Sequence, residues 1–284
     1  MELLHFEFFR NALIAGLFVS VACAIIGTYV VINRIVFITG GIAHAAYGGI
    51  GLGVFFGLNP VLGAVVFSLA AAFGMGTVSY KTKQRIDTLI GVMWAVGMAI
   101  GIVFADLAGG YTAGLMSYLF GSILTISKTD LLLMAGLDIL VLITTGLFYQ
   151  RWLSISFDPE FSEIVGLPVK RYYLLLLGLT ALTVVMVMRM VGIIMVIALL
   201  TIPPAIANRY FTSLKKIMAF ACLLGALFTV TGMFISFYLD LTSGAMIILV
   251  AGIAYFISLG INPKPRSSRS MVNTGEGGKD GIAS

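Results

Sequence analysis

The sequence contains very few charged residues, and this scarcity excludes a soluble globular protein. Only 10% of its 284 residues are Asp, Glu, Lys or Arg, whereas 60% are hydrophobic. Soluble domains usually carry about 25% charged residues. The chain is therefore an integral membrane protein. We expect no cleavable signal peptide, because the first apolar segment, roughly 11–32, is long enough to span and no clear cleavage site follows it.

Cysteine and histidine are also scarce, with two residues of each. Cys23 and Cys222 lie in apolar segments without a CxxC spacing, so we interpret them as buried free thiols rather than as a metal site. The sequence has no HExxH motif, which argues against a metalloprotease, and no GxxxxGK[ST] loop for ATP. We therefore expect no catalytic centre and no permanently bound cofactor.

The positive charges indicate topology rather than nucleic-acid binding, although the net charge is +5. Apart from Arg10, Lys128 and Arg189, all Lys and Arg residues fall near 34, 81–85, 151–171, 209–216 and 264–279. By the positive-inside rule these stretches are cytoplasmic. We expect the N-terminus outside and the C-terminus in the cytoplasm, in the plasma (inner) membrane of a prokaryote.

Apolar segments of spanning length predict an all-α fold, a polytopic transmembrane helix bundle of about nine spans. They run approximately over 11–32, 38–57, 60–79, 87–106, 130–149, 171–188, 191–208, 217–239 and 244–261. The short apolar segment 112–126 must begin and end on the outer side of the membrane, because the next span has to finish in the cytoplasm. We therefore expect this segment to be re-entrant or interfacial. We assign 1–261 to one transmembrane domain and expect 262–284 to be a disordered cytoplasmic tail.

The longest polar interruption contains a short amphipathic helix, which we place at about 158–166. Asp158 is suited to cap it, and Glu160 and Glu163 place negative charge near its positive end. Phe161 shares one face with other apolar residues, and Gly166 ends the helix. The helix either covers the membrane interface or docks a cytoplasmic partner.

A second interruption lies inside an apolar segment, at Pro203 and Pro204. The two prolines remove the hydrogen bonds that the carbonyl groups of Leu199 and Leu200 would accept in a helix. Thr201, water or a passing cation could satisfy these carbonyls. The resulting break serves either packing or transport.

A histidine inside a glycine-rich span is the main candidate for a functional site. His44 lies about 10 Å from the cytoplasmic end of its span, and Gly40, Gly41, Gly48 and Gly51 share its helix face. Ionisable groups at membrane depth usually face a wet pathway or the protein interior. Neutral imidazole suits zinc and, with carboxylate help, manganese or iron. The alternative is a hydrogen-bonded core histidine.

Three carboxylates are further candidates for a metal pathway. Asp106 and Asp240 lie at outer ends of spans, where they could attract a cation or simply be solvated. Asp87 starts a span beside the Lys and Arg residues at 81–85, so a helix cap or a local ion pair is its alternative role.

Six stretches in order resemble the membrane subunit of the ATP-binding-cassette importers for zinc, manganese and iron. They are 41–53, 87–91, 119–124, 157–161, 191–203 and 239–244. The resemblance implies a permease subunit that forms a homodimer with the metal path on its axis. It also implies a cytoplasmic ATPase that binds the 158–166 helix and uses the ATP, and an extracytoplasmic metal-binding protein. The lipid bilayer is the remaining partner, and nucleic acid is not one.

The sequence departs from the family at the histidine. Many members carry Asp four residues before it, where this chain has Gly40. Asp87, Asp106, Asp240 or backbone carbonyls would then have to complete a site around His44. Among the transported metals we expect zinc first, then manganese and iron. An ATP-independent secondary transporter or channel is the alternative, although no internal repeat supports it.

Overall fold

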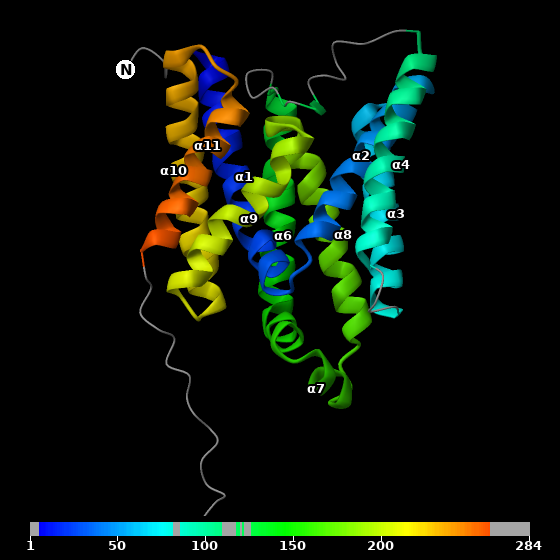
Figure 1. The fold of residues 1–284 in the computed structure, drawn as a ribbon, viewed down its shortest axis with the longest axis vertical. Helices are drawn as coiled ribbons and strands as arrows, with labels where there is room; N and C mark the ends of the chain where they lie inside the picture. The colour runs from blue at the N-terminus through cyan, green and yellow to red at the C-terminus, as the bar shows by residue number, and fades with distance from the viewer. Residues whose placement is uncertain (1–5, 82–85, 110–117, 120, 122–125, 262–284) are drawn as a thin grey trace, which may run out of the picture.

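The computed structural model describes residues 6–81, 86–109, 118–119, 121 and 126–261, which form helices and no strand (Figure 1). Nine long helices lie at the nine expected positions, and a short helix, α7, lies between two of them. They are α1 (Glu7–Ile32), α2 (Val36–Phe55), α3 (Pro60–Lys81), α4 (Ile86–Leu107), α6 (Lys128–Phe157), α7 (Pro159–Ile164), α8 (Val169–Val191), α9 (Ile193–Tyr210), α10 (Leu214–Leu239) and α11 (Ser243–Gly260).

The predicted all-α transmembrane bundle is confirmed. Within the described residues, eight of the long helices are apolar and long enough to cross a membrane, and α9 is not among these eight. The 112–126 segment lies mostly outside the described residues, and the 262–284 tail lies outside them entirely. Gly121 is described, and it packs at a φ of +75° against the backbone at the α8–α9 junction.

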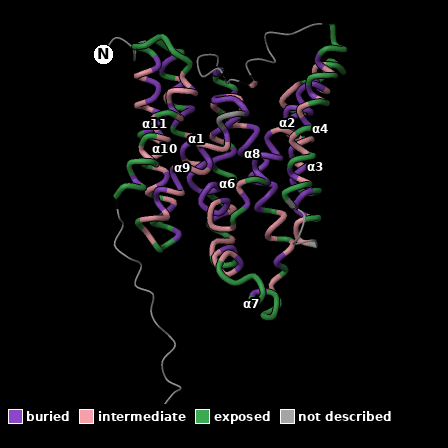
Figure 2. Tube along the Cα trace, in the orientation of Figure 1, coloured by how far each residue is buried: buried purple, intermediate pink, exposed green. Residues whose placement is uncertain are grey.

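The helices form two groups on either side of α6 and α8 (Figure 1). Helix α2 packs against α3 and α4 in one group, and α1 packs against α9 and α10 in the other. Burial separates central from peripheral helices, because 78% of the α2 span is buried but only 22% of the α4 span (Figure 2). The peripheral helices expose Leu, Ile, Val and Phe side chains, as lipid-facing helices do.

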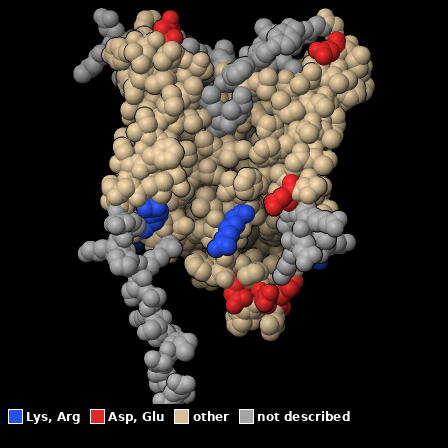
Figure 3. Space-filling model, in the orientation of Figure 1, with Lys and Arg blue, Asp and Glu red and all other residues tan. Residues whose placement is uncertain are grey.

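The charged residues lie mainly at the two ends of the molecule. On the face shown in Figure 3, Lys and Arg side chains lie toward the end that carries α7. At the opposite end, two of the three exceptions to the charge pattern are paired with carboxylates: Lys128 with Glu7, at 2.7 Å, and Arg189 with Asp130. Pairing offsets the charge of these two cations, so they weigh little in the positive-inside pattern, and the orientation stays a prediction.

Candidate functional site

His44 is the one residue that is not fully buried in the central part of α2. Over residues 38–51 of α2, every residue except His44 is buried. Helices α3 and α4 cover most of α2, and α8 and α9 also contact it. His44 therefore lies on a closely packed helix and is itself only partly buried.

The indole ring of Trp94, on α4, covers the imidazole of His44. The two ring centroids are 5.1 Å apart and the planes are tilted by 30°. Neither His44 Nδ1 nor Trp94 Nε1 has a hydrogen-bond partner among the described residues, although both atoms are buried. A structural histidine would normally be hydrogen-bonded when buried. The Nδ1 atom of His44 thus lacks, among the described residues, the hydrogen bond that a structural core histidine would make.

The same indole fills the space above Gly40. A Cβ atom added at Gly40 would lie 2.5 Å from Cζ2 of Trp94 and 3.0 Å from Cδ1 of Ile197, on α9. A larger side chain at this position would therefore have to displace the indole. The Trp94 indole therefore occupies the space that a side chain at position 40, one helical turn before His44, would need.

The glycine face of α2 packs closely on α4 and α3. A Cβ at Gly48 would lie 2.8 Å from the carbonyl oxygen of Gly97, and one at Gly51 would collide with the carbonyl oxygen of Gly101. Gly41 faces Met75 of α3, with a Cβ-to-Sδ distance of 2.9 Å.

Sequence reasoning missed the partner glycines on α4. Gly97 and Gly101 are four residues apart, and this small-xxx-small spacing in an apolar helix is a signal for close helix packing. The spacing could have predicted the α2–α4 contact.

The three carboxylate candidates do not gather around His44. Asp106 lies in the last turn of α4 and Asp240 caps the end of α10, and Figure 1 places these helix ends on opposite sides of the molecule. Asp87 is exposed in the first turn of α4, at the other end. In the described part of the chain, no three His, Cys, Asp or Glu side chains could hold a metal together.

Helix α7 has the predicted start and end. The Asp158 side chain accepts a hydrogen bond of 2.8 Å from the Phe161 backbone N–H, and Gly166 has a φ of +89°. The buried Ser162 hydroxyl lies 2.9 Å from the Ser154 hydroxyl of α6, and the Tyr80 hydroxyl of α3 donates to Glu163. These contacts fix α7 to two spans.

The apolar face of α7 points away from the rest of the chain. Ile164 is 83% exposed, Val165 62% and Phe161 58%. Exposed apolar side chains at the end of the molecule mark either a protein-binding or a membrane-binding surface, the two roles expected from the sequence.

A cavity of about 710 Å³ lies between α7 and the adjoining ends of α2, α3, α4 and α8. Its charged lining residues are Arg34, Asp87, Glu160 and Glu163. The sequence predicts a metal pathway for Asp87 and an ATPase contact for the two glutamates. The structure brings all three carboxylates to one cavity, away from the opposite end where Asp106 and Asp240 lie.

The two prolines do not interrupt α9, which continues through Pro203 and Pro204. The Thr201 hydroxyl donates to the carbonyl of Ile197, at 2.7 Å, and not to either freed carbonyl. The carbonyl oxygen of Leu200 instead lies against Gly27 of α1, where a Cβ would collide with it. The expected helix break is therefore not found. The prolines only remove backbone hydrogen bonds from α9, which packs on α1 at this point.

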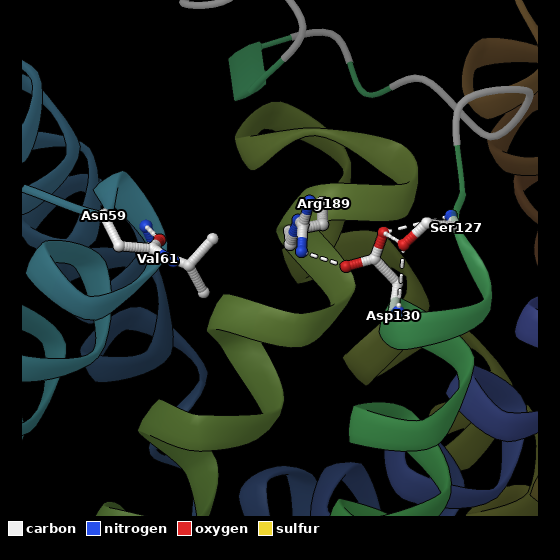
Figure 4. Close-up of polar contacts among 5 residues, drawn as sticks. All are labelled: Asn59, Val61, Ser127, Asp130 and Arg189. Carbon is white, nitrogen blue, oxygen red and sulfur yellow. Dashed lines mark hydrogen bonds and ion pairs between the residues drawn. The ribbon is translucent and has the colours of Figure 1, made fainter.

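Sequence reasoning also missed two acidic residues in α6. Asp130 forms a capping box with Ser127 and pairs with Arg189 of α8 (Figure 4). Figure 4 also shows Asn59, whose side chain accepts a hydrogen bond from the Val61 backbone N–H at the start of α3.

The second missed residue, Asp138, is 6% exposed within the membrane-spanning part of α6. An ionisable residue inside an apolar span was the signal that could have identified Asp138.

Comparison with known proteins gives one consistent result. A membrane protein of Synechocystis sp. is 57% identical over 259 residues, 91% of this chain and 92% of its own length. The manganese transport system membrane protein MntC of Listeria monocytogenes is 33% identical, over 92% of this chain and 93% of its own. The solved structure of PsaBC from Streptococcus pneumoniae in complex with Fab superposes with a TM-score of 0.84. That match has 31% identity and covers 93% of this chain and 95% of the PsaBC chain.

The profile of the ABC 3 transport family matches residues 5–262, which is nearly the whole described chain. The chain is thus a transport subunit rather than an enzyme, and the resemblance read from the sequence is confirmed. This protein belongs to the ABC 3 transport family, as a multi-span permease subunit of a metal importer.

Proposed function

We propose that two copies of this chain form the translocation path of an ATP-driven importer for divalent transition metal ions, with His44 on the path. The observation that carries the proposal is that His44 alone is not fully buried among residues 38–51 of α2, and that its Nδ1 has no hydrogen-bond partner among the described residues. One imidazole is a weak ligand set. A second copy, related by a two-fold axis, would bring a second imidazole to the same place.

Manganese is the metal that we place first in this proposal. Relatives named for manganese transport cover more than nine-tenths of the chain. Imidazole alone would suit zinc better, but a site on a transport path must release its ion, so ligand preference decides little. Our sequence-based order, with zinc first, stays untested.

The proposed partners bind at opposite ends of the subunit. The exposed face of α7 would dock a cytoplasmic ATPase, because it presents three large apolar side chains on a helix fixed to α6 and α3. The other end, with Asp106 and Asp240, would receive an extracytoplasmic metal-binding protein. The C-terminus would then lie in the cytoplasm of a prokaryotic cell.

Reconstitution in liposomes with the partner ATPase tests this function. We expect uptake of manganese that requires ATP, the ATPase and a loaded binding protein, and a complex that contains two copies of this chain. Metal flux by this chain alone would instead support the secondary transporter or channel.

A further inference from the structure

A groove of about 830 Å³ runs along the outside of the helix bundle, separate from His44. Helix α1 forms its floor, and α6 and α10 form its walls. Both walls pack on α1. Within residues 19–30 of α1, only Val21 is not buried, and it lies in this floor.

Most of the groove is apolar. Val21 and Ile25 line the floor, and Leu142, Leu147 and Met218 line the walls. Leu142 and Leu147 are 52% and 70% exposed. In a bilayer such a surface is suited to the acyl chain of a lipid.

The mouth of the groove is basic. Arg151 of α6 and Lys215 of α10 line it from opposite walls, at the end of the molecule that carries α7. No Asp or Glu is found among its described lining residues. Asp138 lies on α6 thirteen residues before Arg151, about 20 Å along the helix, too far to neutralise the mouth.

Aromatic side chains hold both cations in place. Arg151 Nη1 donates a hydrogen bond of 2.6 Å to the Tyr172 hydroxyl, and its guanidinium lies 5.7 Å from the ring centre of Phe148. The ammonium of Lys215 lies 5.0 Å from the ring centre of Tyr149. Cations positioned beside aromatic rings at the end of a span are placed at the depth of lipid headgroups.

A buried hydroxyl deeper in the groove lacks a partner. Thr145 lines the groove and is only 7% exposed, yet its Oγ1 has no hydrogen-bond partner among the described residues. It lies six residues before Arg151, about 9 Å deeper along α6. The ester carbonyls of a phospholipid also lie deeper than its phosphate, so one of them could accept the Thr145 hydrogen bond.

We propose that this groove binds one anionic phospholipid. Its phosphate lies between Arg151 and Lys215, an ester carbonyl accepts from Thr145, and an acyl chain lies on Val21 between α6 and α10. Basic pockets between spans at the cytoplasmic side recognise anionic headgroups in this way. The site is independent of metal transport.

Native mass spectrometry of the full-length protein in mild detergent tests the charge requirement. The probe is phosphatidylglycerol, with phosphatidylcholine as the zwitterionic comparison. We expect Arg151→Gln combined with Lys215→Gln to weaken phosphatidylglycerol binding roughly 30-fold, from the contribution of two cations near a headgroup. The control, Lys216→Gln, removes an exposed cation that is not among the lining residues. Equal retention of the two lipids, or equal effects of the two changes, would overturn the proposal.

Two further variants test the position of the lipid. Leu142→Trp should fill the groove and reduce binding, whereas Ile143→Trp, at an equally exposed position outside the groove, should not. Thr145→Val should reduce binding without changing the charge. If both Leu142→Trp and Thr145→Val leave binding unchanged, the lipid does not lie here. Disulfide formation between two copies carrying Leu147→Cys would place a second copy in the groove and would also overturn the proposal.

Discussion

Arg189 of α8 pairs with Asp130 of α6, and Asp130 also closes the capping box at the start of α6 (Figure 4). One carboxylate therefore both begins a span and balances a cation on the neighbouring span. The side chains are 28% and 10% exposed, so solvent screens the pair only partly.

Asp130→Asn should destabilise the protein on the order of 3 kcal/mol, because it leaves Arg189 without its partner in a largely buried place. Replacing Asp130 and Arg189 together with leucine should cost less than Asp130→Asn alone. Thermal unfolding in detergent measures both effects. Lys128→Gln, which breaks the exposed pair with Glu7, is the control and should change stability by less than about 1 kcal/mol. A larger loss for the double variant would contradict the interpretation.

Trp94 should decide which residues position 40 tolerates. Gly40→Asp alone should lower thermal stability, because its Cβ would meet the indole at 2.5 Å. Gly40→Asp with Trp94→Ala should recover stability and place a carboxylate one turn from His44, which should strengthen metal binding or change the preferred metal.

Thermal unfolding measures the effect on stability, and calorimetry measures the effect on metal binding. Trp94→Ala alone is the reference for both measurements. If Gly40→Asp is as stable as the unmodified protein, the indole does not restrict this position. If the double variant is stable but its metal affinity and preference are unchanged, Gly40 does not face the path.

His44→Ala should abolish or strongly slow metal uptake without loss of folding, because its Nδ1 makes no hydrogen bond to the described residues. Proteoliposome uptake per molecule and the unfolding temperature are the two measurements. Trp94→Phe keeps an aromatic ring beside His44 and serves as the matched variant. A less stable His44→Ala protein with normal uptake per molecule would support a structural histidine instead.

Ile164→Asp should uncouple the ATPase while leaving the permease folded, because this side chain is 83% exposed on α7. We expect loss of transport and of permease-stimulated ATP hydrolysis. Tyr80→Phe removes the contact with Glu163 but keeps the exposed face of α7, so it separates anchoring from docking. Normal stimulation in Ile164→Asp would count against the docking surface, and normal coupling in Glu163→Arg would show that the contact with Tyr80 is not needed for it.

Gly27→Ala should be one of the most destabilising single-methyl changes in the chain. Its Cβ would collide with the Leu200 carbonyl that Pro204 leaves without a helical hydrogen bond. Gly136→Ala is the control, since a Cβ there meets nothing within 4 Å and Ala favours a helix by about 1 kcal/mol. Similar unfolding temperatures for the two variants would show that α1 and α9 can move apart at this contact at little cost in stability.

Pro203 and Pro204 offer a related test. Replacing both with alanine would restore two backbone hydrogen bonds, so we expect a more stable protein with slower transport. Unchanged transport would show that the prolines serve packing only.

Features encoded in short stretches of sequence were predictable. Hydrophobic runs placed eight of the nine long helices within about four residues at each end, and α6 continues eight residues beyond the predicted 149. The runs locate helices because the cost of exposing polar groups to lipid acts on each segment separately. Asp158 and Gly166 likewise predicted the start and end of α7, since a cap and a positive φ are local requirements.

The composition and pattern of the sequence by themselves determined that this is a helical membrane protein and where its long helices lie. Only the tertiary structure decided what surrounds each candidate residue. It placed Trp94 over His44, paired Arg189 with Asp130, and kept Asp106 and Asp240 apart. These relationships join helices that are distant in sequence, and they depend on which faces pack together. Hydrophobicity sets the depth of a helix, but side-chain packing sets its neighbours.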